Sequence, residues 1–176
     1  MTEGLGGPLV DVVRVDENRS VLVAPLELRE GEPSKLERLA LEAGAELAVA
    51  VNWRVVASAR HAAMAARRAL RSFEAGAAIG KTLRTEFLVC LTGTRQVSRA
   101  INLARPEGDR CTLVCVTRDP SSVLERIRSF EAVRVDYPDA FDVLESLGAG
   151  SIAGGTCTGS LEALVMEASA RVEPDR

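Results

Sequence analysis

The sequence predicts an α+β fold, in which a small mixed or antiparallel β-sheet is layered with several α-helices in a single domain over residues 1–176. Segments rich in β-branched residues occur on both sides of a central helical block, without the regular strand–helix alternation of a doubly wound fold. The length suits one domain, and the 47% hydrophobic content is enough for a core. Because aromatic residues make up only 3%, we expect a core of alanine, valine and leucine.

The first third of the chain has the pattern of a β-hairpin, a helix and a further strand. Residues 9–15 and 20–25 are short runs rich in valine and leucine that flank a polar turn. A helix is expected to begin at Pro33, because proline is favoured in a first helical turn, and to end at Gly44. Residues 46–52 form the third predicted strand.

Three helices are predicted in the central block. The first covers residues 54–73, is rich in alanine and is ended by Gly76. Two shorter helices are expected over residues 82–91 and 94–104.

The last third begins with a strand over residues 111–117, which is apolar enough to be central in the sheet. Two helices are expected after it, over residues 119–130 and 138–147, the first capped by its opening aspartate. A glycine-rich connection over residues 147–159 then leads to a last amphipathic helix over residues 160–170.

The cysteine and histidine content argues against a metal site. Four cysteines occur without any C-x-x-C pair, and His61 is the single histidine, so we expect no metal and no cofactor. Cys111 and Cys115 share one face of a strand about 13 Å apart, too far for a disulfide, so reduced thiols are expected. Reduced cysteines, together with the lack of a signal peptide or a membrane-spanning apolar run, predict a cytoplasmic protein.

Charge is distributed unevenly along the chain, although the formal net charge is only −3. Residues 53–105 contain ten basic residues and two acidic ones, Glu74 and Glu86, which gives this segment a charge of +8 and leaves −11 on the rest. Such segregation indicates a polyanionic partner, while the acidic remainder discourages non-specific binding.

The helix predicted over residues 54–73 has two distinct faces at about 100° per residue. Small and apolar residues fall on the face expected to pack against the sheet: Val55, Ala62, Ala66, Ala69 and Phe73. The other face carries what we call the basic stripe: Arg60, Met64, Arg67 and Arg71. Guanidinium groups suit phosphate oxygens and stack on bases, so the stripe predicts a nucleic-acid surface, with a merely solvated face as the alternative.

Other basic residues extend the predicted surface: Arg68, Lys81, Arg84 and Arg95. His61 lies off the basic stripe, and without a second histidine we expect it to form structural hydrogen bonds rather than to act in catalysis.

Two turns deserve comparison with phosphate-binding loops. Residues 76–82, GAAIGKT, resemble a P-loop but are one residue short and follow a helix instead of a buried strand, so nucleotide hydrolysis is not expected. In TGTRQ, residues 92–96, Gly93 is expected to end one helix and Thr94 to cap the next, with Arg95 in its first turn. This turn can hold an anion, but no nucleophile–base pair accompanies it. A phosphate-binding enzyme is therefore the least favoured alternative.

Several segments together resemble one known family: Val56-Ala57-Ser58 with His61, RALRSFEAG at residues 68–76, and KTLRTEFLVCLTGTRQVSRAIN at residues 81–102. They resemble the small regulatory subunit of the KEOPS complex, called PRPK-binding protein in eukaryotes. The G-T-R-Q core is that of the archaeal form, although Thr92 stands where the family usually has serine and Val97 where it has isoleucine.

The resemblance implies a non-catalytic accessory subunit of the machinery that makes threonylcarbamoyladenosine in tRNA. Such a subunit binds and activates the kinase subunit, associates indirectly with the other KEOPS subunits, and recruits tRNA through its 3′ CCA end. A protein–protein interaction module that does not bind RNA is the alternative.

The last predicted helix has apolar residues at spacings i, i+3, i+4 and i+7: Leu161, Leu164, Val165 and Ala168. These residues can pack on the protein's own core. The resemblance implies instead that this end helps to form the kinase interface.

Overall fold

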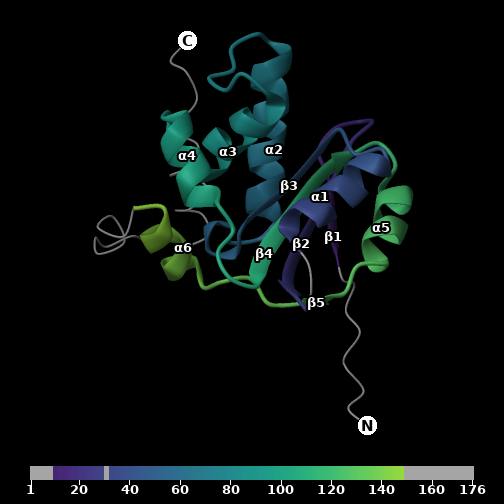
Figure 1. Ribbon diagram of the computed structural model, residues 1–176. Coiled ribbons are helices and arrows are strands. Elements are labelled where there is room, and N and C mark those ends of the chain that lie inside the picture. The colour runs from purple at the N-terminus through teal and green to yellow at the C-terminus, as the bar shows by residue number, and fades with distance from the viewer. Residues whose placement is uncertain (1–9, 30–31, 149–176) are drawn as a thin grey trace.

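The computed structural model describes residues 10–29 and 32–148 and confirms an α+β fold in a single domain (Figure 1). The sheet order is β1 (Asp11–Arg14), β2 (Ser20–Leu28), β4 (Arg110–Thr117) and β3 (Leu47–Asn52), and the described strands pair antiparallel. A short strand, β5 (Ala132–Arg134), pairs with the end of β2. The predicted antiparallel sheet, the N-terminal hairpin and the central position of β4 are therefore confirmed.

Helices cover both faces of the sheet (Figure 1). The α2–α4 layer, which lies on one face, consists of α2 (Ala59–Glu74), α3 (Leu83–Thr92) and α4 (Val97–Ala104). The α1/α5 layer, on the other face, consists of α1 (Pro33–Glu42) and α5 (Pro120–Arg128). A helix near the C-terminal end of the described chain, α6 (Ala140–Ser146), packs beside the short 3₁₀ helix η1 (Trp53–Val55).

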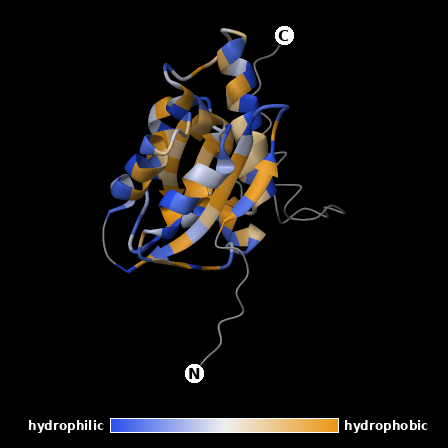
Figure 2. Ribbon diagram, turned by 90° about the vertical axis from the view of Figure 1, so that its right-hand side faces the viewer, coloured by the Kyte–Doolittle hydropathy of each residue, from blue (hydrophilic) through white to orange (hydrophobic). Residues whose placement is uncertain are grey.

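Alternation along the strands produces two separate cores, one under each layer. In β4, Val114 and Val116 face the α2–α4 layer, whereas Cys111, Leu113 and Cys115 face the α1/α5 layer. Both faces of the strand are buried, which explains why its sequence is apolar almost without interruption. The two thiols share a face as predicted, and both are free and buried. Figure 2 shows the resulting hydrophobic strands between more hydrophilic helix surfaces.

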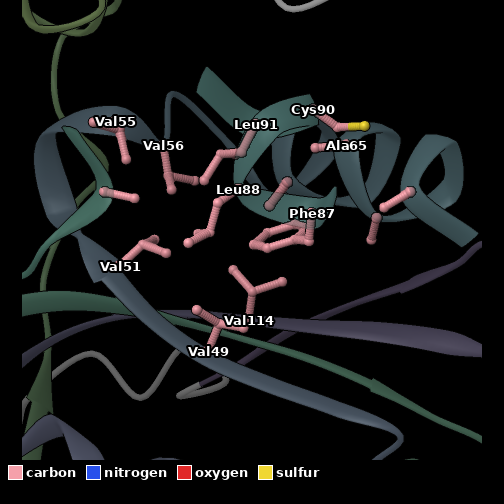
Figure 3. Packing of buried hydrophobic residues seen from close by; sticks show 14 of the residues in the cluster. Val49, Val51, Val55, Val56, Ala65, Phe87, Leu88, Cys90, Leu91 and Val114 are labelled. Carbon is pink, nitrogen blue, oxygen red and sulfur yellow. The ribbon is translucent and has the colours of Figure 1, made fainter. Parts of the chain in front are cut away.

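The core under the α2–α4 layer combines small residues from α2 with large ones from α3. The buried face of α2 is lined by alanines, including Ala62, Ala66 and Ala69, so the helix lies close to its neighbours. Figure 3 shows Phe87 and Leu88 pointing from α3 toward the valines of the strands. Phe87 is fully buried, and its side chain is the largest of those that are fully buried among the described residues. The aliphatic core expected from composition is thus completed by one aromatic ring.

The first central helix differs from its predicted extent of residues 54–73. Val55 belongs to η1, and α2 begins only at Ala59, because Ser58 is extended and its hydroxyl accepts the backbone N–H of His61 at 3.1 Å. The prediction that Phe73 packs against the sheet is wrong: its side chain is 43% exposed. Ala62, Ala66 and Ala69 are buried as expected.

The helix after the TGTRQ turn also begins later than predicted. Thr94 does not cap it; α4 begins at Val97 with Gln96 as N-cap, and the Thr94 hydroxyl instead accepts the Gln96 backbone N–H at 3.3 Å in a local turn. Arg95 therefore precedes the helix. Gly93, at φ +69°, ends α3 as expected.

β5 was not predicted, because three residues give no periodic signal and its position depends on pairing with β2. Most of the glycine-rich connection and the predicted helix over residues 160–170 lie outside the described residues. Within the described part of the chain, no helix has the length and apolar character to cross a membrane.

Candidate nucleic-acid interface on the α2–α4 layer

Both ends of α2 are fixed by local hydrogen bonds. At its start, the Ser58 hydroxyl accepts the backbone N–H of His61, and the His61 ring accepts the backbone N–H of Ala57 through Nδ1 at 3.3 Å. His61 is 1% exposed, so it has the structural role that the sequence indicated. At its end, Gly76 takes φ +66°, which is the conformation that stops a helix. The basic stripe thus lies on a helix with defined limits.

The three arginines of the basic stripe face solvent. Arg60, Arg67 and Arg71 are exposed, and Met64 between them is half-buried. Within residues 10–29 and 32–148, none of these three guanidinium groups forms an ion pair or a hydrogen bond with another residue. At 1.5 Å per residue, the stripe extends about 16 Å along the helix axis. It therefore presents a row of charges that no acidic side chain among the described residues pairs with directly.

The two acidic residues of the basic segment do not balance the stripe. Glu86 is 2% exposed and points into the protein, whereas Glu74 pairs with Arg19 of the β1–β2 turn at 2.7 Å. Beside this pair, a hollow of about 240 Å³ has Arg67 and Arg71 on one wall and acidic residues of the turn on the other. Excess positive charge thus remains on the outward face of α2.

The other predicted surface residues differ in their surroundings. Lys81 and Arg95 are exposed and Arg68 is half-buried. Arg84 forms a two-pronged ion pair with Glu37 of α1, at 2.9 Å and 3.0 Å, so its charge is already balanced within the protein. The structure therefore separates Arg84 from the basic stripe.

A family model described as kinase binding protein CGI-121 matches residues 31–139. The chain belongs to the CGI-121 family. No curated protein matches the sequence at a significant level. The match covers every segment on which the resemblance to the small KEOPS regulatory subunit rested, and it confirms that family assignment. It ends before the predicted helix over residues 160–170.

In this CGI-121 protein, the P-loop-like stretch over residues 76–82 binds a carboxylate group from the chain itself, that of Glu86. The backbone N–H groups of Ile79 and Gly80 donate to Oε2 of Glu86 at 2.8 Å and 2.7 Å. A carboxylate thus occupies the place that a phosphate takes in a true P-loop. The fit is tight at Gly80, where an added Cβ would lie 2.4 Å from the Glu86 backbone nitrogen. The stretch serves to fix the α2–α3 connection.

Both threonines of the TGTRQ turn form local hydrogen bonds. The Thr92 hydroxyl donates to the Leu88 carbonyl at 2.8 Å, and Thr94 closes the turn on Gln96. The Gln96 side chain makes no capping hydrogen bond. Arg95 stands exposed in front of this helix start, where it adds positive charge to the layer.

A second hollow, of about 250 Å³, lies between α3, α4 and β3, and the sequence did not indicate it. It combines an apolar lining with two arginines: Val49, Ala50, Arg84, Thr85, Leu88, Ile101, Ala104, Arg105 and Pro106. Ile101 is 39% exposed beside this hollow. Helical periodicity could not reveal the hollow, because the hollow depends on how α4 is placed relative to β3 in three dimensions.

Proposed function

We propose that this chain is a non-catalytic accessory subunit of the KEOPS complex, which makes threonylcarbamoyladenosine in tRNA. In this role it binds and activates the kinase subunit and recruits tRNA through its 3′ CCA end. The observation that carries the proposal is the basic stripe: three exposed arginines on α2 lack any counter-ion among the described residues, in a chain of net charge −3. Membership of a family of kinase-binding proteins supports the kinase contact.

Phosphate contacts dominate the affinity of proteins for nucleic acid, and each neutralised phosphate releases counterions. An RNA strand lying along α2 meets the guanidinium groups of Arg60, Arg67 and Arg71, and Met64 offers an apolar contact to a base. We assign the flanks of the surface to Arg68, Lys81 and Arg95. Arg84 contributes least, because Glu37 already occupies both prongs of its guanidinium group.

The kinase contact is proposed on a different part of the chain. We assign it to the apolar stripe of the predicted C-terminal helix, namely Leu161, Leu164, Val165 and Ala168. The other KEOPS subunits are reached through the kinase.

The test is tRNA binding by the full chain over a range of salt concentrations. Wild-type protein should bind with a steep salt dependence, and Arg60→Glu/Arg67→Glu/Arg71→Glu should abolish binding. The matched control is Arg38→Glu/Arg126→Glu/Arg128→Glu, which reverses the same number of charges on the α1/α5 layer. Equal affinity of the wild type and the α2 triple variant would contradict the assignment of this surface.

A second measurement separates recruitment through the 3′ end from general RNA binding. tRNA lacking its terminal CCA should bind at least about tenfold more weakly than intact tRNA, since stacking of single bases contributes roughly 1–3 kcal/mol each. If no RNA binds while the kinase is still captured, the chain is a protein–protein interaction module. Turnover of a phosphate ester that Arg95→Ala removes would favour an enzyme using the TGTRQ turn.

A further inference from the structure

Strand β3 lies at the edge of the described sheet, with β4 on one side and no strand on the other. Its sequence, LAVAVN, contains no charge and no proline, and its side chains are buried on both faces. Exposed edge strands of this composition readily pair with a strand from another molecule. Something must therefore occupy the outward N–H and C=O groups of β3 if the edge is to stay unpaired.

Two side chains from opposite layers meet over this edge. Glu37 comes from α1 and accepts the backbone N–H of Ala50 through Oε1 at 2.7 Å. Arg84 comes from α3 and donates to the backbone carbonyl of Ala48 at 3.3 Å. The same two side chains bind each other in the two-pronged ion pair. They thus close a bridge from one helical layer to the other, across the outward groups of Ala48 and Ala50.

This pair differs from an ordinary surface ion pair, which contributes little to stability. Glu37 has only 16% of its side chain exposed and satisfies an edge N–H group as well as the arginine. An incoming strand needs the Ala50 N–H and the Ala48 carbonyl for its own ladder, so it must first displace both side chains. By contrast, the Arg38–Glu42 pair on the same helix is 3.7 Å long and has 69% and 51% of its side chains exposed.

We propose that Glu37 and Arg84 form an edge clasp that prevents β3 from pairing with β3 of a second copy of this chain. Opening the clasp frees an apolar, self-complementary strand, and two such strands can pair antiparallel about a two-fold axis. The apolar hollow that adjoins β3 at Val49, Leu88 and Ile101 then lies beside the new interface. The proposal does not depend on the proposed function, because it concerns the oligomeric state of the chain alone.

The experiment compares Glu37→Ala with the matched control Glu42→Ala, which removes the same group from the same helix away from any strand edge. Sedimentation equilibrium over a wide range of concentrations should give a monomer for the wild type and the control, and a doubled mass for Glu37→Ala at high concentration. Arg84→Ala should behave in the same way. Glu37→Gln keeps an acceptor for the Ala50 N–H, so it should dimerise less than Glu37→Ala. It also provides a second variant at this position in case Glu37→Ala does not fold.

Amide hydrogen exchange identifies the interface. At low concentration, the Ala50 amide of Glu37→Ala should exchange about ten- to a hundredfold faster than in the wild type, the change expected for losing one hydrogen bond to a charged group. At high concentration its protection should return as β3 pairs. A folded Glu37→Ala variant that stays monomeric at high concentration would overturn the proposal, as would a folded Arg84→Ala variant that stays monomeric or a dimer in which the Ala50 amide stays unprotected.

Discussion

The arginines around Glu42 and those of the basic stripe lie on opposite layers and differ in how their charge is balanced. In the α1/α5 layer, Arg38 and Arg126 share the carboxylate of Glu42, at 3.7 Å and 3.5 Å. In the α2–α4 layer, Arg60, Arg67 and Arg71 have no such partner among the described residues. The charges of Arg38 and Arg126 are thus balanced within the protein, whereas α2 carries a row of positive charge with no such partner among the described residues.

The unbalanced row has an energetic consequence. Like charges at i, i+4 on a helix repel by roughly 0.2–0.5 kcal/mol per pair, so Arg67 and Arg71 weaken α2 slightly. A feature that lowers stability without serving the fold is typical of a binding surface. The layer must then be attached to the sheet by other means. Near the end of α2, Glu74 forms an ion pair with Arg19 of the β1–β2 turn. Apolar packing supplies the rest.

The largest effect is therefore expected from Phe87→Ala. The ring is fully buried between α3 and the strands, and its removal should lower the free energy of unfolding by about 3–5 kcal/mol. The matched control is Phe73→Ala, the same deletion at a side chain that is 43% exposed on α2, with a loss below about 1 kcal/mol. Urea unfolding followed by circular dichroism measures both. Similar losses for the two variants would contradict the packing described for this layer.

The sheet face under the α1/α5 layer carries two buried thiols, Cys111 and Cys115. We therefore expect the free energy of unfolding to fall at alkaline pH. Burial, and then the Glu37 carboxylate, raise the pKa of Cys111 to about 12, and burial likewise raises the pKa of Cys115. In the unfolded chain a thiol ionises near 8.5, so the stabilising effect is complete below that pH and is lost as the pH rises toward 12. At 1.36 kcal/mol per unit, Cys111 accounts for roughly 3 kcal/mol near pH 11.

Unfolding free energies measured from neutral to alkaline pH test this expectation. Cys111→Ala should be less stable than the wild type at neutral pH, because a cavity forms, yet lose less stability above about pH 9. Parallel pH curves for the two proteins would show that this thiol is not the group responsible.

These contrasts also show which parts of the structure are local enough to be predicted from sequence. Short apolar runs rich in β-branched residues predicted the strands, and the i, i+4, i+7 spacing predicted the exposed arginines, because both patterns depend on neighbouring residues. Phe73 was misplaced because the periodic pattern continues past the point where α2 still lies over the sheet. The pairing of Arg84 with Glu37 joins residues 47 positions apart, and the capture of two loop amides by Glu86 depends on a fold of the loop that no motif describes.

Helix capping differs between α5 and α4, which lie on opposite faces of the sheet. The Asp119 carboxylate caps α5 by accepting the backbone N–H of Ser122 at 3.2 Å and its hydroxyl at 2.6 Å, whereas α4 has no side-chain cap at Gln96. Asp119→Ala should lower Tm by about 2–4 °C, and Gln96→Ala should leave it nearly unchanged. The hydrogen bonds from Ser122 lower the pKa of Asp119, so its contribution is present above about pH 4 and disappears as the pH falls further.

Thermal scans of both variants at neutral and acidic pH provide the measurement. The difference between the wild type and Asp119→Ala should shrink at acidic pH. A constant difference would mean that the charge of the carboxylate plays no part in the cap.

The smallest expected effect on stability comes from replacing single arginines. It distinguishes an ion-paired arginine, Arg126, from an arginine of the basic stripe, Arg67. Arg126→Ala removes one of the two ion-pair partners of Glu42 and should cost up to about 0.5 kcal/mol. Arg67→Ala removes only repulsion and should leave stability unchanged or raise it by about 0.3 kcal/mol. Binding should show the reverse order. Arg67→Ala should weaken tRNA binding and reduce its salt slope by about 1, while Arg126→Ala should leave both unchanged. If Arg67→Ala instead destabilised the fold without affecting tRNA, the stripe would be a structural feature, and the difference between the layers would have no bearing on RNA.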